Sequence, residues 1–458
     1  MTHMTINPSD NVAVDLKTGH KVAIRSITAG EKVIKYGFPI GYATRDIAKG
    51  QQVHVDNLKT SLSDKIVYQY RPKLPKLQPW VGPEIQAYIW ENGDIGIRND
   101  VWIIPTVGCV NKIAERLSNL TGALSFTHPY GCSQLGEDHA LTEKILSGLV
   151  NHPNAGGVLV LGLGCENNNI PEFKKVLGRV NEKRVKFLNT QDCEDEITEG
   201  VSLIQELQAY AASFKRQPVS ISHLKVGLKC GGSDGFSGIT ANPLVGQFSD
   251  LLISAGGSTV LTEVPEMFGA ETILMDRCIN EEVFNKTVKL INQFKEYFIS
   301  HKQPIYENPS PGNKAGGITT LEEKSLGCTQ KGGTGPVVDV LDYGDVVTKN
   351  GLNLLNGPGN DIVAITNLTA AGCHLILFTT GRGTPLGAPV PTVKIATNGD
   401  LATKKKQWID FDAGPMLQGK DLSEDLFQYI IQVANGMQTA NEKNGYREIA
   451  IFKDGVIL

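Results

Sequence analysis

The hydrophobic pattern divides the chain into an N-terminal part with short strands and a longer part in which strands and helices alternate. Up to about Leu62, runs such as VAVDL, HKVAI and VHVDN are separated by glycine-containing or charged turns, which predicts a small all-β module. From about Ile85 onward, continuous apolar runs such as VWIIPTVG and GGVLVLGLG alternate with helical stretches. Continuous runs are typical of strands covered on both faces. The pattern therefore predicts an α/β main body with mostly parallel sheets, preceded by a small all-β domain.

Proline and glycine mark the expected boundaries between these parts. The segment RPKLPKLQPWVGPE contains four prolines, which disfavour helix and indicate an extended linker. A softer boundary falls in NPSPGNKAGG at residues 308–317. We therefore predict an all-β domain at 1–70, a linker at 71–84, a central α/β domain at 85–307 and a C-terminal α/β portion at 308–458.

Composition and charge narrow the classes of protein. The 458 residues suffice for two to three domains, and a net charge of -4 gives no reason to expect nucleic acid or an anionic membrane as a partner. No uncharged apolar stretch approaches the ~18 residues of a membrane span, and MTHMTINPSD does not resemble a signal peptide. The eight cysteines form no CxxC pair, so we expect reduced thiols in a cytoplasmic protein. A homo-oligomer is compatible with these features.

Five loops that follow apolar strands are rich in glycine and small polar residues, and four of them contain a cysteine. They are TVGCVN at 106–111, HPYGCSQLGEDH at 128–139, GLGCENN at 162–168, LKCGGSDGFSG at 228–238 and FTTGRGTP at 378–385. Ligands of open α/β sheets bind beyond the carboxyl ends of the strands, so we expect these loops to converge on one sheet edge around a polar, anionic small molecule. The loops lack a complete dinucleotide fingerprint and a P-loop ending, so neither NAD nor ATP is expected.

These loops supply the first set of candidate site residues. Lys229 and Arg382 could hold a carboxylate, and Asn111, Glu166 and Asp234 could orient hydroxyl groups. Four thiols could line the pocket, although buried cysteine is also common in cores. They are Cys109, Cys132, Cys165 and Cys230. His128 and His139 flank one thiol and two acids, so each could be an acid/base group or part of a turn or helix cap.

The β-module contains a second cluster of candidates. In a regular strand, His54 and Asp56 of VHVDN project from the same face, and His20 opens a potential neighbouring strand. Two imidazoles and one carboxylate resemble a facial triad for Fe(II) or Mn(II); the alternative is a pair of surface histidines beside a solvated aspartate. Lys35 and Tyr36 of KYG could add a cation and a phenol, or form an ordinary exposed turn.

Taken together, these motifs resemble the altronate/galactarate dehydratase family, whose members dehydrate sugar acids and carry an N-terminal SAF (β-clip) domain. GHKVAI, KYGFPIGYAT and VHVDN resemble the SAF portion, and IPTVGCVN, HPYGCSQLGEDH, GLGCENN and LKCGGSDGFSGITANPLVG resemble the central part. NPSPGNKAGGITTLEEKSLGCTQKGGT, GPGNDIVAIT and LFTTGRGTPLGAPVPTVKIATN resemble the C-terminal part. The resemblance extends from Gly19 to about Val456.

The resemblance implies a hydro-lyase that converts D-altronate to 2-dehydro-3-deoxy-D-gluconate and water in galacturonate catabolism. It implies a divalent metal, Fe(II) or else Mn(II), which we assign to His20, His54 and Asp56, although the family often has histidine at the position of Asp56. Ligation of Fe(II) by one of the four thiols is the competing assignment. The alternative substrates are galactarate or another α-hydroxy acid such as sulfolactate, and the non-enzyme alternative is a regulatory protein that binds a sugar acid.

The chemistry of dehydration suggests roles for the remaining candidates. Dehydration requires a base at C2 and an acid at the leaving C3 hydroxyl, for which we expect His128 or His139, with Lys35 and Tyr36 nearby. Substrate oxygens are expected to contact Lys229, Lys314 and Arg382.

Overall fold

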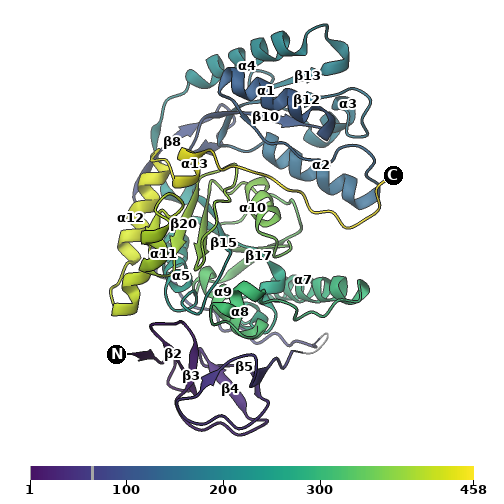
Figure 1. Ribbon diagram of the computed structural model, residues 1–458. Helices are drawn as coiled ribbons and strands as arrows, with labels where there is room; N and C mark the ends of the chain where they lie inside the picture. Colours follow the sequence, from purple (N-terminus) through teal and green to yellow (C-terminus); the bar gives the residue numbers. More distant parts are fainter. Residues whose placement is uncertain (1, 63–65) are drawn as a thin grey trace.

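The computed structural model describes residues 2–62 and 66–458; residues 1 and 63–65 of the predicted 1–70 module lie outside the described residues. Figure 1 shows an elongated molecule with the N-terminal module at one end and an α/β domain at the other. A larger α/β body lies between them. No helix of the described part is long and apolar enough to cross a membrane.

The N-terminal module is all-β, as predicted. One sheet has the order β1-β2-β3-β6, and the other has the order β4-β5-β7. Their bounds are β1 (His3–Met4), β2 (Val12–Asp15), β3 (Lys21–Ala23), β4 (Lys32–Lys35), β5 (Phe38–Ala43), β6 (Gln52–Val53) and β7 (Leu58–Lys59). All pairings within these sheets are antiparallel, and Val33, Ile40 and Val53 pack in the core between them.

VHVDN is not a regular strand, so the condition under which His54 and Asp56 would share one face is not met. β6 ends at Val53, and the chain turns at residues 54–57. Asn57 makes this turn: its side chain accepts from the backbone N–H of His54 at 2.9 Å and donates to the carbonyl of Gln52 at 2.9 Å. His54 and Asp56 therefore do not share the face of a strand.

The domain at the far end has a four-stranded parallel sheet of order β11-β10-β12-β13. The strands are β10 (Asp100–Pro105), β11 (Leu124–Ser125), β12 (Ala155–Gly162) and β13 (Val185–Asn189). Ile103 and Leu161 face α1 (Asn111–Thr121) and α4 (Glu196–Ala212), whereas Trp102 and Val160 face α2 (Gly136–Val150) and α3 (Ile170–Leu177). Both faces of this sheet are therefore covered, which explains the continuous apolar runs.

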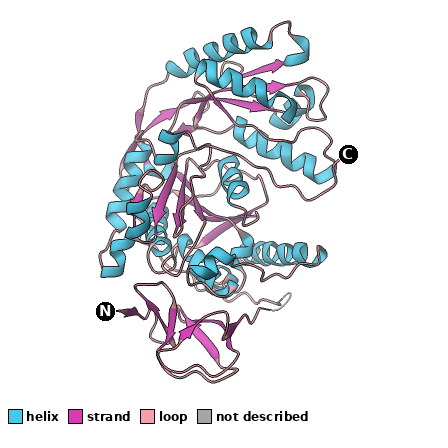
Figure 2. Cartoon of the chain, viewed as in Figure 1, coloured by secondary structure: helices cyan, strands magenta, loops and turns pink. Residues whose placement is uncertain are grey.

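The central body is built on a seven-stranded parallel sheet of order β17-β18-β16-β15-β19-β20-β21. Its strands are β15 (Lys225–Cys230), β16 (Ser258–Leu261), β17 (Val337–Leu341), β18 (Gly351–Leu355), β19 (Leu375–Thr380), β20 (Thr392–Ala396) and β21 (Phe411–Asp412). Its helices are α5 (Ala241–Ser254), α6 (Glu271–Met275), α7 (Glu281–Ser300), α8 (Pro311–Ala315), α9 (Leu321–Cys328), α10 (Asp361–Ala370), α11 (Gly399–Lys404), α12 (Ser423–Ala434) and α13 (Ala440–Asn444). Figure 2 shows helices on both sides of these strands.

The topology changes two expectations. Three of the five polar loops follow β10, β11 and β12 of the four-stranded sheet, and the other two follow β15 and β19 of the seven-stranded sheet. Their predicted convergence on one sheet edge is therefore wrong. The seven-stranded sheet also takes strands from both sides of residues 308–317, so the fold has no domain boundary there.

A small antiparallel sheet joins the domain at the far end to the body. It has the order β14-β8-β9, with β8 (Glu84–Ile89), β9 (Ile95–Gly96) and β14 (Gln217–Ser220). Because β8 and β9 precede the far domain in the chain and β14 follows it, the two connections lie side by side. The described residues 66–83 before this sheet form no helix or strand, and β8 begins at Glu84, the last residue of the predicted 71–84 linker.

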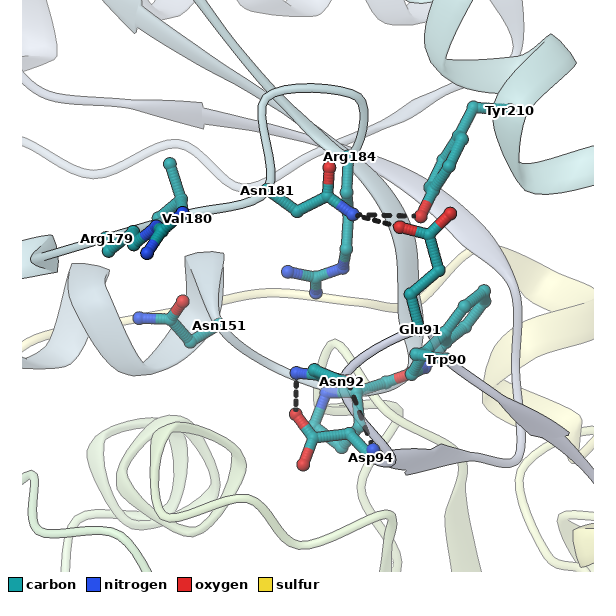
Figure 3. Close-up of a pocket in the computed structure, with 11 residues that line it drawn as sticks. Trp90, Glu91, Asn92, Asp94, Asn151, Arg179, Val180, Asn181, Arg184 and Tyr210 are labelled. Atoms are coloured by element: carbon teal, nitrogen blue, oxygen red, sulfur yellow. Dashed lines mark hydrogen bonds between the residues drawn. The ribbon is translucent and has the colours of Figure 1, made fainter.

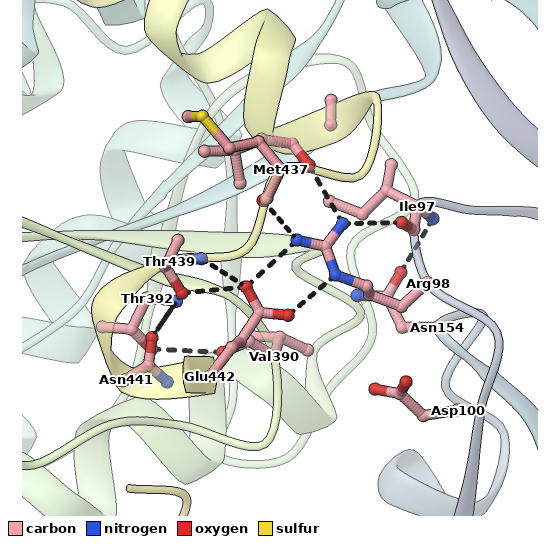
Figure 4. A network of polar contacts seen from close by, with 12 residues as sticks. Ile97, Arg98, Asp100, Asn154, Val390, Thr392, Met437, Thr439, Asn441 and Glu442 are labelled. Atoms are coloured by element: carbon pink, nitrogen blue, oxygen red, sulfur yellow. Dashed lines mark hydrogen bonds and ion pairs between the residues drawn. The ribbon is translucent and has the colours of Figure 1, made fainter. Parts of the chain in front are cut away.

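A buried arginine fixes this junction to the C-terminal helices (Figure 4). The guanidinium of Arg98 donates two bonds to the carboxylate of Glu442, at 2.8 and 3.0 Å. Its other contacts are the carbonyls of Ile97, Val433 and Met437. Burial alone would raise the pKa of Glu442, but Arg98 outweighs this effect and lowers that pKa. The hydrogen bonds of the guanidinium offset the free energy lost when the two charges leave water. Loss of either partner would therefore leave an uncompensated buried charge.

We expect Glu442→Gln to lower the free energy of unfolding by about 3 kcal/mol, because Arg98 would keep its charge without a counterion. Urea titration followed by circular dichroism measures this change. Glu31→Gln is the matched control, because the Arg25–Glu31 pair lies on the surface, and it should leave the urea midpoint unchanged. Equal midpoints for the two variants would contradict the proposed role of the junction.

Candidate active site between the N-terminal module and the body

The candidate site is built around α9, a charged helix that is buried along its whole length. The side chain of Thr320 caps its N-terminus, and the Thr320 hydroxyl donates to the carbonyl of Ile40 in the N-terminal module at 2.6 Å. Buried charges are unfavourable unless they are paired. The charged groups of α9 therefore require partners, and these come from both the module and the body.

Glu323 of α9 pairs with two lysines of the N-terminal module. Its two carboxylate oxygens lie 2.7 Å from Lys21 Nζ and 2.8 Å from Lys35 Nζ. Burial alone would raise the pKa of Glu323, but the two lysines outweigh this effect and lower it to about 2. Burial lowers the pKa of Lys21 to about 8, whereas for Lys35 the attraction of Glu323 outweighs burial and raises the pKa. Of the two lysines, Lys21 is therefore the one that can release a proton near neutral pH.

Tyr36 extends from the module into the body. It adopts a left-handed backbone with φ of 61°, which brings its hydroxyl against the loop after β15. A Cβ atom at Gly238 would lie only 2.2 Å from the Tyr36 hydroxyl oxygen, so this approach requires glycine at that position. Burial raises the pKa of Tyr36, so the phenol stays protonated and can donate a proton.

His20 and His54 lie together at the edge of this interface, half-buried, with ring centroids 5.1 Å apart in an edge-to-face arrangement. His20 Nδ1 bonds the side chain of Gln52 at 2.8 Å, and His54 Nδ1 lies 3.0 Å from the hydroxyl of Thr319. The Thr319 hydroxyl accepts from Lys21 Nζ at 2.9 Å. His54, Thr319, Lys21 and Glu323 thus form one continuous polar chain across the interface.

Two properties suit these imidazoles to metal binding. His20 Nδ1 accepts from the Gln52 amide and His54 Nδ1 bonds the Thr319 hydroxyl, while Nε2 of each ring has no hydrogen-bond partner among the described residues. Because a neutral ring that accepts at Nδ1 carries its proton on Nε2, a cation at His20 Nε2 requires the Gln52 amide to turn its oxygen toward Nδ1–H. Burial, together with the charges of Lys21 and His20, lowers the pKa of His54. A neutral imidazole is the form that binds a cation, and the pair therefore fits a divalent metal.

Asp56 does not join the two histidines. Its carboxylate forms an ion pair with Arg45, and 59% of its side chain is exposed. The reason is the turn at residues 54–57, which carries Asp56 to the surface. The predicted set of His20, His54 and Asp56 is consequently reduced to two imidazoles in this structure.

A second group of metal-ligand type lies deeper in the body. Glu266 Oε2 lies 3.2 Å from Cys230 Sγ and 3.1 Å from Cys328 Sγ, and the two sulfur atoms are 3.3 Å apart. Among the described residues, this is the only trio of His, Cys, Asp or Glu whose ligand atoms all lie within 4.8 Å of one another. All three residues are buried. Two thiols and a carboxylate suit a soft or borderline divalent cation.

Three lysines surround this buried trio. Lys324 Nζ lies 2.8 Å from Glu266, Lys331 Nζ lies 3.9 Å from Glu263, and Lys229 pairs with Glu263 and Asp361. Burial would raise the pKa of Glu266, but the lysines, Lys324 first, outweigh it and lower that pKa. A hydrogen bond from the Cys328 thiol lowers the pKa of Cys230. The predicted substrate ligand Lys229 is thus committed to the buried carboxylate of Glu263 and to the partly exposed carboxylate of Asp361.

Three predicted substrate-binding residues lie in the body near the module, two of them in loops and one in the short helix α8. Asp234 follows β15 and accepts hydrogen bonds from Thr397 at 2.9 Å and from Asn398 at 3.2 Å. The backbone of Arg382 donates to Gly232 at 3.0 Å, which places it beside the same loop, with an exposed side chain. Lys314 lies in α8 and is half-buried.

The loop after β15 packs closely against both α8 and the module. Gly235 N–H donates to the carbonyl of Gly316, which follows α8, at 2.7 Å. A Cβ atom at Gly235 would lie 1.9 Å from the carbonyl oxygen of Gly19, next to His20. The segments that carry Asp234, Lys314 and His20 therefore meet at one place.

The remaining predicted residues belong to the four-stranded domain, at the other end of the molecule (Figure 1). They are His128, His139, Asn111, Glu166, Cys109, Cys132 and Cys165. His128 is buried, and both ring nitrogens form hydrogen bonds: Nε2 bonds the carbonyl of Pro105 at 2.8 Å, and Nδ1 accepts from the N–H of Tyr130 at 3.2 Å. Burial lowers the pKa of His128 to about 4. His139 Nε2 lies 3.3 Å from Glu143. Neither histidine can serve the interface site within this chain.

Two further predicted residues are engaged within that domain. The Glu166 carboxylate accepts from the Thr106 hydroxyl at 2.6 Å and from the N–H groups of Leu163 and Gly164. Asn111 donates to the carbonyl of His128 at 2.9 Å. Both side chains organise the strand-end loops.

A polar cavity of about 390 Å³ lies elsewhere, between the β8–β9 hairpin and the four-stranded domain (Figure 3). Asn181 links Glu91 and the hydroxyl of Tyr210 across it, at 2.9 and 3.1 Å. Arg184 also lines the cavity, and its guanidinium donates to the carbonyls of Val150, His152 and Ala155. Its lining contains none of the predicted site residues.

Several residues of the interface site were absent from the sequence prediction. They are Lys21, Glu263, Glu266, Thr319, Glu323, Lys324, Cys328 and Lys331. The sequence LEEKSLGC has as many charged residues as a surface helix, so its burial could not be predicted from the segment itself. The backbone of Glu263 marks this region as a candidate site in the structure. Its left-handed φ of 68° is rare for a residue with a side chain, and such residues cluster at functional sites.

The comparisons with known proteins cover almost the whole chain. Residues 11–61 match the Altronate/galactarate dehydratase SAF domain, residues 87–212 match the D-galactarate dehydratase/Altronate hydrolase second domain, and residues 221–457 match the D-galactarate/Altronate dehydratase C-terminal domain. An altronate dehydratase of Bacillus subtilis (strain 168) is 56% identical over 98% of this chain and 94% of its own length. An altronate dehydratase of Escherichia coli (strain K12) is 55% identical over 99% of this chain and 94% of its own length. A galactarate dehydratase (L-threo-forming) of the same organism is 34% identical over 95% and 89%, respectively.

The pairing of Glu323 gives a pH-dependent prediction. Because folding lowers the pKa of this carboxyl to about 2, its contribution to stability is complete above its unfolded pKa of ~4.3 and is lost as the pH falls through 2. We expect the stability difference between wild type and Glu323→Gln to shrink by about 2 kcal/mol between pH 6 and pH 3. Urea titrations at both pH values measure it. A difference that does not change with pH would show that Glu323 is not held ionised by the two lysines.

Proposed function

Because the chain belongs to the altronate/galactarate dehydratase family, we propose that it removes water from D-altronate to give 2-dehydro-3-deoxy-D-gluconate. The two altronate dehydratases are far more similar to this chain than the galactarate dehydratase is, which favours D-altronate over galactarate. The structural observation that carries the proposal is the polar chain of His54, Thr319, Lys21 and Glu323 across the interface between the module and the body.

The reaction sets clear requirements for the site. A base must take the proton from C2, positive charge must stabilise the enediolate that develops, and an acid must protonate the C3 hydroxyl as it leaves. The resulting enol becomes the 2-keto acid without any net oxidation. The residues at the interface offer one group for each requirement.

Lys21 is the base in this proposal. Burial lowers its pKa to about 8, so a useful fraction of the amine is deprotonated near neutral pH. Lys21 Nζ is fully buried against the Gly317 carbonyl, the Thr319 hydroxyl and Glu323. Because Thr319 also bonds His54 Nδ1, the amine takes the substrate proton through the Thr319 hydroxyl in this proposal. Lys35 keeps its proton because Glu323 holds it, and it leaves a positive charge beside Tyr36.

Tyr36 is the acid in this proposal. Its pKa is raised by burial, so the phenol carries its proton at neutral pH, and Lys35 Nζ lies 4.8 Å from the ring centroid. The charge of Lys35 stabilises the phenolate that forms when Tyr36 gives up the proton. Arg382 and Lys314 keep accessible cationic side chains and bind the substrate carboxylate.

The metal of this proposal is Fe(II), with Mn(II) as substitute, and His20 and His54 would hold it through Nε2. When bound, the cation would supply positive charge to the carboxylate and C2 oxygen of the substrate. Both imidazoles are half-buried, so a cation can reach them from solvent. The buried group of Cys230, Glu266 and Cys328 is the second candidate, because its ligand atoms are already close together.

Substrate identity is tested with anaerobically purified protein supplied with Fe(II) or Mn(II). We expect 2-keto-3-deoxy acid from D-altronate and at least 100-fold less from galactarate at equal concentration, because the hydroxyl stereochemistry must match fixed polar groups. Product from galactarate alone would overturn the substrate. Binding of D-altronate without turnover would favour the regulatory alternative, and inactivity on both acids would direct the search to a sulfonated hydroxy acid.

The base is tested by the pH dependence of kcat/KM. A lysine with a pKa of about 8 must lose its proton to act, so we expect the rate to rise with pH through about 8 and then level off. Lys21→Met should lower kcat at least 100-fold, whereas Lys17→Met, an exposed position in the same module, should leave it unchanged. A limb near pH 6.5 that persists in Lys21→Met would assign the base to a histidine.

The metal site is tested by metal content under anaerobic conditions. We expect His54→Gln to lose the bound ion, with Asp56→Asn and Cys328→Ser retaining it, because Asp56 is paired with Arg45. His3→Gln is the control, since His3 is an exposed histidine of the same module. Loss of the ion only in Cys328→Ser would move the site to the buried trio, and loss in Asp56→Asn would restore the three-ligand set.

A further inference from the structure

Three cysteines outside the candidate active site lie at one edge of the four-stranded sheet. Cys109 follows β10, Cys132 follows β11 and Cys165 follows β12, and the sheet order β11-β10-β12 makes these strands neighbours. All three thiols are free and exposed. Exposed cysteine is uncommon in a folded chain, so three such thiols on adjacent strand ends require an explanation.

The loops that carry these thiols are tied to one another by hydrogen bonds. The N–H of Gly108 donates to the carbonyl of Tyr130, and the N–H of Asn168 donates to the carbonyl of Gly131, each at 2.9 Å. Asn167 accepts from the N–H of Ser133 at 2.9 Å. The loop of Cys132 is therefore joined on one side to the loop of Cys109 and on the other to the loop of Cys165.

The backbone of the middle loop is held in an unusual form. Gly131 has φ of 100°, and a Cβ atom there would lie 1.9 Å from the carbonyl oxygen of Thr106. Ser133 has φ of 59° although it carries a side chain. Cys132 thus sits between two left-handed residues, and its position is fixed relative to the β10 loop.

The spacing of the sulfur atoms bears on what they can bind. The three Sγ atoms do not all lie within 4.8 Å of one another. A single tetrahedral zinc ion with Zn–S bonds of ~2.3 Å would need sulfur atoms ~3.8 Å apart. An iron–sulfur cluster binds each thiolate through a different iron, so it spans wider separations.

We propose that Cys109, Cys132 and Cys165 bind an iron–sulfur cluster of the [4Fe–4S] type, with one iron that no cysteine holds. The electrostatics agree with an anionic group, because α1 begins two residues after Cys109 and α2 begins four residues after Cys132. Helix N-termini favour negative charge. The side chain of Gln191 also donates to Cys165 Sγ at 3.4 Å, and such bonds tune cluster sulfur.

Neither His128 nor Glu166, which lie in the same loops, is free to bind the fourth iron. Both nitrogens of His128 and both carboxylate oxygens of Glu166 are already engaged. Gln134, two residues after Cys132, has a buried side-chain nitrogen without a partner. The open iron would therefore carry water or an oxygen ligand of a small molecule.

Anaerobic reconstitution of the full chain with Fe(III), a thiol reductant and sulfide tests this proposal, since the thiol supplies the electrons that reduce part of the iron. We expect about four iron atoms and about four acid-labile sulfide ions per chain, together with the visible absorption and Mössbauer spectrum of a [4Fe–4S] cluster. Cys109→Ser, Cys132→Ser and Cys165→Ser should each lower the sulfide content at least fivefold. Circular dichroism would verify that each variant folds.

Two controls keep this result separate from the candidate active site. Cys193→Ser alters a half-buried thiol of the same domain that bonds the Asn189 carbonyl, and Cys328→Ser alters the buried trio of the body; both should retain full sulfide. Iron without sulfide, zinc in place of iron, or unchanged sulfide in the triple Cys109/Cys132/Cys165→Ser variant would overturn the proposal. Because the readout is sulfide content, it is independent of whether the chain dehydrates D-altronate.

Discussion

The arrangement of the site depends on one buried ion triad, Lys21–Glu323–Lys35. Glu323 comes from α9 of the body, and the two lysines come from sequence positions about 300 residues earlier in the N-terminal module. A carboxylate buried without these lysines would be too unfavourable to keep its charge. The module must therefore pack on α9 for the buried charges of both parts to have partners. Docking also brings His20, His54 and Tyr36 to the loops of the body, so the interaction that holds the module also completes the site.

The charges around α9 form two layers with different access to solvent. The outer layer contains the half-buried imidazoles, and Thr319 connects them to the ion triad. The inner layer contains Cys230, Glu266 and Cys328 among three lysines, all of them buried. The outer layer is open to solvent and so to a polar sugar acid. The inner layer is closed to solvent, and its charges contribute to the electrostatic potential at the outer layer. We therefore place the substrate at the histidines and not at the thiols.

Much of the fold was predictable from the sequence because it depends on local patterns. Continuous apolar runs identified parallel strands with both faces covered, and short alternating runs identified the all-β module; the family resemblance is confirmed as well. The order of strands within sheets is not a local property. The five polar loops looked equivalent in sequence but belong to two sheets at different places. The turn made by Asn57 likewise removed Asp56 from the histidines, and the burial of LEEKSLGC depends on partners far away in the chain.

We place metal and substrate between the module and the body, at His20 and His54. A crystal structure of the Mn(II)-loaded wild-type protein with a D-altronate analogue that lacks the C3 hydroxyl, recorded with anomalous scattering from manganese, tests this placement with the ion triad intact. We expect an anomalous peak bonded to Nε2 of His20 and His54, with density for the analogue between these rings, Tyr36 and Arg382. A manganese peak confined to Cys230, Glu266 and Cys328, or substrate bound at the edge of the four-stranded sheet, would contradict it.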